Sequence, residues 1–123
     1  MNIVEKFIEE VIAAHKTGAA TEHSYRPALQ SIFNALAKGV TALNEPKRVA
    51  CGAPDFIIQR GEIVIGHAEA KDVGVSIRTL NEFNKNQQER YRKALPNLIY
   101  TNCLDWDFYQ NGEIIATVSI ASL

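Results

Sequence analysis

Residues 55–71 read DFIIQRGEIVIGHAEAK and contain two apolar runs separated by Arg60-Gly61. A short turn with glycine between two such runs is typical of a β-hairpin. We therefore expect strands over 55–59 and 62–71, joined tightly enough that they pair with each other.

The second predicted strand has two unlike faces. Side chains alternate along a strand, so Glu69 and Lys71 project together, while Ala68 and Ala70 project to the other side. The small apolar side is typical of a strand that a helix covers closely. The charged pair then stands at the end of a buried strand, where charge is costly unless it is paired. An ordinary ion pair at a solvated strand end, worth about 0–1 kcal/mol, would give the same tripeptide.

The remaining elements follow from helical and strand periodicity along the chain. Helices are expected over 2–17, between a cap at Ser24 and a stop at Gly39, and over 78–94; strands are expected over 40–45, 97–102, 105–110 and 113–119. The order ααβββαβββ predicts an α/β domain with a central mixed β-sheet flanked by helices. One helix crosses over between two strands of that sheet.

Length and composition favour an ordinary globular protein. The chain has 123 residues, which suits a single domain over 1–123, with 46% hydrophobic residues, 22% charged residues and a net charge of −1. No signal peptide or membrane-spanning run is evident, so we expect a cytoplasmic protein. Cys51 and Cys103 have no His or Cys at metal-ligand spacing and are expected to be reduced thiols.

Residues at the start of the hairpin suggest a catalytic site. Pro54-Asp55 enters the first strand, and hairpin pairing can bring Asp55 close to Glu69. Two carboxylates and several waters suit a hard cation such as Mg²⁺. Lys71 would orient an attacking water or stabilise charge, which is the chemistry of phosphodiester hydrolysis. Asp55 taken alone is also a common turn or cap residue.

Pro54-Asp55 followed by Glu69-Ala70-Lys71 resembles the signature of the PD-(D/E)xK nuclease superfamily. The resemblance implies a restriction-endonuclease-like core in which Asp55 and Glu69 bind metal and Lys71 is catalytic.

Two further features resemble members of that superfamily. Glu22, at the mouth of a helix, stands where many members add a metal-binding acid, and Gln87 and Tyr91 form a Gln-x-x-x-Tyr like that of type I restriction subunits. Gln87 and Tyr91 share one helix face, so both can point at the site. Alternatively, Glu22 complements the positive end of its helix, and Gln87 and Tyr91 pack on the sheet.

Most of the chain resembles the N-terminal nuclease domain of type ISP restriction-modification enzymes. The resemblance is carried by four runs of sequence: Thr21–Leu29 (TEHSYRPAL), Asn44–Arg48 (NEPKR), Gly52–Phe56 (GAPDF) and Glu69–Gly74 (EAKDVG). It implies translocase, methyltransferase and target-recognition domains as partners, in the same polypeptide or separate. The chain is then a fragment of a larger polypeptide or a stand-alone relative.

The overall charge of the chain indicates how it would bind DNA. A sequence pI near 6.3 lacks the basic footprint of a protein that finds DNA unaided, so we expect delegated DNA binding. Candidate phosphate contacts lie on or near the third predicted helix: Arg78, Lys85, Arg90, Arg92 and Lys93. The same residues would also serve as the solvated face of an amphipathic helix.

The main hypothesis is thus a Mg²⁺-dependent DNA endonuclease domain of a restriction-modification system, with Mn²⁺ as a substitute. Its expected metal ligands are Glu22, Asp55 and Glu69, and its expected catalytic residues are Asp55, Glu69, Lys71, Gln87 and Tyr91. The alternative is a catalytically silent domain of the same kind that binds nucleic acid or protein. A more remote alternative is a small α/β domain with an ordinary ion pair.

Overall fold

The structure, a computed structural model, describes residues 2–44 and 51–122. The elements in these ranges are α1 (Ile3–Lys16), the 3₁₀ helix η1 (Glu22–Tyr25), α2 (Arg26–Ala35), β1 (Val40–Asn44), β2 (Phe56–Arg60), β3 (Ile63–Ala70), α3 (Glu82–Ala94), β4 (Asn97–Thr101), β5 (Asp105–Gln110) and β6 (Glu113–Ser119). Apart from η1, their order is the predicted ααβββαβββ. None of the described helices is long and apolar enough to cross a membrane.

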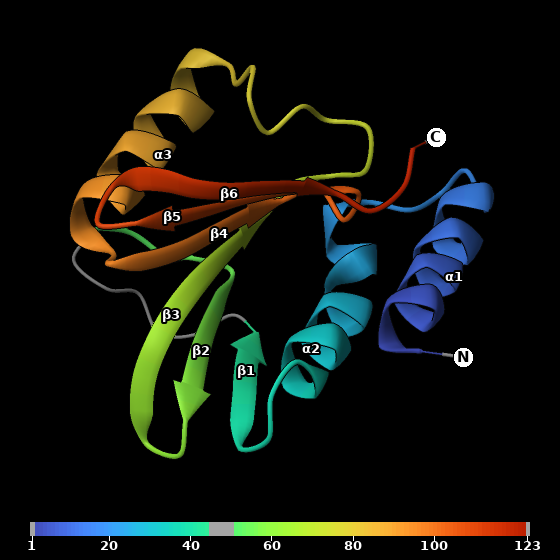
Figure 1. Cartoon of the computed structure of the whole chain (residues 1–123). Helices are drawn as coiled ribbons and strands as arrows, with labels where there is room; N and C mark the ends of the chain where they lie inside the picture. Colours follow the sequence, from blue (N-terminus) through green and yellow to red (C-terminus); the bar gives the residue numbers. More distant parts are fainter. Residues whose placement is uncertain (1, 45–50, 123) are drawn as a thin grey trace.

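The six strands form one mixed sheet in sequential order, β1-β2-β3-β4-β5-β6. β3 and β4 are parallel, and every other neighbouring pair is antiparallel. Since parallel neighbours need a crossover, the chain passes through α3 between β3 and β4 (Figure 1). The predicted mixed sheet with a helical crossover is therefore confirmed.

The sheet is covered on both sides. Figure 1 shows α1 and α2 side by side on one side and α3 on the other. The main core lies under α1 and α2, where Phe33 packs edge-on against Phe56 and Trp106. Ala68 and Ala70 are completely buried in this core, as the small face of β3 predicts. A smaller cluster lies under α3 and comprises Tyr91, Leu95, Leu98, Tyr100 and Tyr109.

The predicted start of the second helix is corrected by one residue, because its N-cap is Tyr25 and not Ser24. Ser24 does not cap α2. Its hydroxyl accepts a hydrogen bond from the Thr21 amide over 2.9 Å, as part of a capping box around η1. This box fixes a 3₁₀ turn, and α2 then begins at Arg26, with Pro27 in its first turn.

The third helix begins four residues later than predicted, at Glu82 instead of residue 78. Asn81 is its N-cap and accepts a hydrogen bond from the Asn84 amide over 2.9 Å. Before it, the Ser76 hydroxyl accepts the amides of Arg78 and Thr79, which holds these residues in a turn. Phe83, which the predicted apolar stripe includes, lies in the first turn of α3 but is 73% exposed and does not pack in the core.

Candidate active site

The hairpin of β2 and β3 joins the two predicted carboxylates through backbone hydrogen bonds. The Asp55 amide donates to Glu69 Oε1 over 3.1 Å, and the Ala70 amide donates to Asp55 Oδ2 over 2.8 Å. This follows from the register, in which Phe56 is paired with Ala68. Both carboxylates are buried, with Glu69 only 4% exposed. The structure thus brings Asp55 and Glu69 together as the hairpin predicts.

Lys71 follows the last residue of β3 and remains tied to the sheet, because its amide donates to the Thr101 carbonyl over 2.8 Å. Its ammonium lies 3.4 Å from Glu69 Oε2. Two side chains of α3 complete its surroundings, Asn84 Oδ1 at 3.1 Å and Gln87 Oε1 at 3.2 Å. The side chain is buried, so these three oxygen partners provide the hydrogen bonds that a buried ammonium requires.

Gln87 therefore contacts the site directly, as its position on the helix suggested. Asn84 was missed by the sequence analysis. It lies three residues before Gln87 and so on the same helix face, which is the signal that could have found it.

Tyr91 both packs on the sheet and lies near the site, the two alternatives that the sequence left open. It is 1% exposed and packs in the smaller core cluster on the sheet, yet Glu69 is close enough to influence it. Burial, followed by the charge of Glu69, raises the pKa of Tyr91 to about 12, and a hydrogen bond with the Ala53 backbone lowers it. The hydroxyl is thus neutral at physiological pH. Gly52 lies against the same ring, where an added Cβ would be 3.0 Å from Tyr91 Cε1.

Glu22 begins η1 and lies at the edge of the site. Burial raises its pKa, and the charges of Lys71, Asp55 and Arg26 act on it in that order of size. It is thus near Asp55 and Lys71, but among the described residues it does not complete a metal-binding group of three ligands. Within residues 2–44 and 51–122, no three His, Cys, Asp or Glu side chains are arranged to hold a metal ion.

Arg26 is a site residue to which the sequence analysis gave no role. Its Nη2 lies 2.6 Å from Asp55 Oδ1, and both side chains are about nine-tenths buried. Arg26 is the first residue of α2, where the helix dipole disfavours a positive charge. The carboxylate of Asp55 compensates for that placement.

Electrostatics make the site receptive to a cation. Burial and the nearby charge of Asp55 raise the pKa of Glu69 to about 8, although Lys71 and the Asp55 amide act in the opposite direction. An added positive charge would relieve both effects by stabilising the ionised carboxylate.

The donor set also fits a hard divalent ion. Each carboxylate uses two of about four lone-pair positions in the contacts described, which leaves oxygen acceptors for a metal. Mg²⁺ is commonly bound through one or two carboxylates and several waters, so a third protein ligand is not required. Asp55 and Glu69 are the residues that could hold it, and the charge of Asp55 also acts on Glu22.

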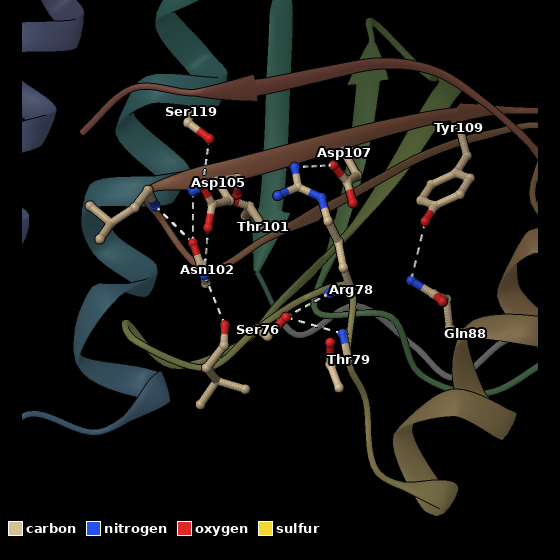
Figure 2. Close-up of polar contacts among 12 residues, drawn as sticks. Ser76, Arg78, Thr79, Gln88, Thr101, Asn102, Asp105, Asp107, Tyr109 and Ser119 are labelled. Atoms are coloured by element: carbon tan, nitrogen blue, oxygen red, sulfur yellow. Dashed lines mark hydrogen bonds and ion pairs between the residues drawn. The ribbon is translucent and has the colours of Figure 1, made fainter. Parts of the chain in front are cut away.

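Two of the five candidate phosphate-binding residues have short structural contacts, and a third, Arg90, donates to the Cys51 carbonyl over 3.5 Å. Arg78 Nη2 lies 2.7 Å from Asp107 Oδ1, and this carboxylate is 1% exposed (Figure 2). Arg92 donates twice to the Gly112 carbonyl, over 3.0 and 2.7 Å, and stacks over the Tyr109 ring. Both guanidinium groups thus contribute to the fold, and a phosphate contact by either one stays a prediction.

The other three candidates lie on the outer surface of α3. Lys85, Arg90 and Lys93 are exposed. Arg90 and Lys93 line an open cleft of about 810 Å³ next to the turn between β5 and β6. Of the motif residues considered above, 45–48 lie outside the described part of the chain, so Lys47 and Arg48 are not placed.

Comparison with known proteins finds similar solved structures. No family model and no curated protein matches the chain. Seven chains of solved structures do match, and one is the cryo-electron microscopy structure of a DrdV–DNA complex, with a TM-score of 0.76 and 23% sequence identity. The alignment covers 96% of this chain but 12% of that chain, so this domain corresponds to a small part of a much larger protein. The likeness shows that the two share a fold.

Proposed function

We propose that the chain is a metal-dependent DNA endonuclease domain of the PD-(D/E)xK type and the cleavage module of a restriction-modification system. The observation that carries the proposal is the convergence of Asp55, Glu69 and Lys71 at one buried point, with Lys71 held between a carboxylate and the amides of α3. Asp55 and Glu69 keep oxygen acceptors that a divalent ion could use, and Lys71 adds a buried positive charge beside them. A site of this composition is therefore suited to metal-assisted hydrolysis.

In this proposal Asp55 and Glu69 hold Mg²⁺, or Mn²⁺ in its place, with Glu22 in support. When bound, the ion would polarise a phosphoryl oxygen and acidify a water. Lys71 orients that water and stabilises the charge that develops on the phosphate. Gln87 and Asn84 keep the ammonium at its position, and Tyr91 packs the floor of the site as a neutral phenol.

DNA as the substrate is supported by the likeness to DrdV, a protein whose solved structure includes DNA. The small share of that protein covered by this fold supports a cleavage module that works beside other domains. A translocase, a methyltransferase and a target-recognition domain, in cis or in trans, are the partners that we propose. Such partners would provide the DNA affinity that a chain with a net charge of −1 lacks.

A second candidate is a catalytically silent domain that binds nucleic acid or protein. The short ion pair between Arg26 and Asp55 favours it, because Arg26 already neutralises one of the two proposed metal ligands. Under this alternative the buried charges would be purely structural.

The deciding experiment is cleavage of supercoiled plasmid by the domain at high concentration. We expect nicking with Mg²⁺, none with EDTA, and none for Lys71→Ala. Lys38→Ala, at an exposed lysine in the loop after α2, is the matched control and should cut normally. Titration of Mn²⁺ by calorimetry accompanies it. Absence of both cleavage and metal binding would favour the silent domain, and full cleavage by folded Lys71→Ala would exclude the proposed mechanism.

A further inference from the structure

Arg26 carries its positive charge at an unfavourable place, at the N-terminus of a helix and away from solvent. It starts α2, whose first turn contains no acidic residue, and it is 7% exposed. A buried guanidinium at a helix N-terminus is destabilising unless a nearby anion compensates for it. Asp55, at 2.6 Å, is such an anion. The pair links α2 to the start of β2, so the position of Arg26 is determined by the site.

The two oxygens of Asp55 are not equivalent. Oδ2 accepts the Ala70 amide, whose direction is fixed by the sheet, whereas Oδ1 accepts the side chain of Arg26. A side chain can move more easily than a strand. Oδ1 is therefore the oxygen for which a divalent ion and Arg26 would compete most directly.

The charges around the site support such competition. Arg26 and Lys71 provide two positive charges against Asp55 and Glu69, and Glu22 lies close by. When both central carboxylates are ionised, these two cations balance them without a metal. A divalent ion entering this arrangement meets a resident cation on one of its ligands, and two positive charges at that separation repel strongly at low dielectric.

We propose that Arg26 is an internal counter-ion that competes with the divalent ion for Asp55. In the metal-free domain it neutralises the Asp55 carboxylate and stabilises the fold. When metal binds, the ion and Arg26 share the charge of the Asp55 carboxylate, so Arg26 lowers the metal affinity of the site. The inference rests on the metal site of the proposed function, but not on cleavage, and it makes Arg26 a residue that sets the metal concentration at which the domain is active.

The test is Mn²⁺ titration by calorimetry of the full chain and two variants. Arg26→Gln removes the charge and keeps an amide donor, and we expect it to bind Mn²⁺ about 10-fold more tightly. Arg26→Lys keeps the charge and should bind nearly as the parent chain does. Arg60→Gln, at the exposed end of β2, is the matched control and should leave the affinity unchanged.

Folding is followed by thermal melting in EDTA and in Mn²⁺. We expect Arg26→Gln to melt lower than the parent chain in EDTA and to gain more from Mn²⁺. Should the variant be unfolded in EDTA, its recovery by Mn²⁺ would support the inference, and failure to recover would overturn it.

The outcomes separate the inference from the proposed function. If the parent chain binds Mn²⁺ and folded Arg26→Gln binds equally or more weakly, Arg26 positions Asp55 and the competition is wrong, while the metal site stands. If only Arg26→Gln binds, the competition is supported in its strongest form. If neither binds, the metal site and the inference both fail.

Discussion

The main-chain amide of Asp55 donates a hydrogen bond to the side chain of Glu69 over 3.1 Å, so the backbone at one carboxylate fixes the orientation of the other. The amide of Ala70 holds Asp55 in the same way. Each acid thus accepts a hydrogen bond from a backbone amide of the β2–β3 hairpin, and Asp55 is held in addition by Arg26 of α2. Lys71, in contrast, depends on side chains of α3. The proposed metal ligands and the proposed catalytic cation therefore have separate structural supports.

This separation predicts that α3 affects rate without affecting metal binding. Gln87→Ala or Asn84→Ala should lower plasmid nicking by about 10-fold or more, because Lys71 loses a partner that holds its ammonium in place. Mn²⁺ affinity by calorimetry should be unchanged. Gln88→Ala, next to Gln87 but directed toward the Tyr109 hydroxyl, is the control and should retain activity. Equal losses for all three variants would mean that damage to α3, not loss of these contacts, is responsible.

The raised pKa of Glu69 predicts a pH dependence of stability. A carboxyl group whose pKa rises from 4.5 to about 8 on folding binds more protons in the folded state. Its stabilising contribution is complete below pH 4.5 and is lost as the pH rises through 8. Without metal, the free energy of unfolding should therefore fall between pH 5 and pH 9, by on the order of 2 kcal/mol relative to Glu69→Gln.

Urea denaturation of the parent chain and of Glu69→Gln at several pH values measures this difference. The pH-dependent contributions of all other titratable groups are common to both proteins and cancel in the comparison. Mg²⁺ should reduce the loss, because it binds the ionised carboxylate. Parallel pH profiles for the two proteins would contradict the prediction.

Gly52 should be intolerant of substitution because of its backbone and its neighbour. Its φ is +138°, and a Cβ there would lie 3.0 Å from the ring of Tyr91. Gly52→Ala should destabilise the domain by about 2–4 kcal/mol, through strain and displacement of that ring. At Gly61 φ is +61° with nothing within 4 Å, so Gly61→Ala should cost only about 1 kcal/mol. Equal melting temperatures for the two variants would be inconsistent with this packing.

Arg78 should matter for stability more than for DNA binding. Removing it leaves the buried Asp107 carboxylate without its ion-pair partner, so Arg78→Ala should lower the free energy of unfolding by about 1–3 kcal/mol. Arg60→Ala, at an exposed strand end, should change it by less than about 0.5 kcal/mol. Fluorescence anisotropy with labelled duplex DNA, at a temperature where both variants are folded, should show similar affinities. A selective loss of DNA binding for Arg78→Ala would instead support a phosphate contact.

Local patterns predicted most of the fold. The alternation around Glu69 and the turn at Gly61 correctly gave the hairpin and its buried small face. The predicted starts of the helices were less accurate, because capping hydrogen bonds from side chains determine where a helix begins. Ser24 and Asn81 are both suitable caps, and only the surrounding hydrogen bonds determine which turn each one closes.

The candidate site was predictable only in part. Asp55, Glu69 and Lys71 are brought together by one hairpin, so short sequence separations suffice to relate them. Arg26 is 29 positions away from Asp55, and no periodicity or spacing connects them. Arg78 and Arg92 could not be told from surface cations, because their partners, Asp107 and the Gly112 carbonyl, come from the C-terminal hairpin.

The way α3 is attached has a consequence for the exchange of backbone amides. Tyr91 is the one buried residue among the thirteen of this helix, and its other contacts with the sheet are largely polar. An element with so little buried apolar surface opens locally at a lower free energy than the core strands. The amides of α3 should accordingly exchange with solvent before those of β3 and β4. Lys71 would then lose and regain its partners many times within the lifetime of a folded domain, while both carboxylates stay in place.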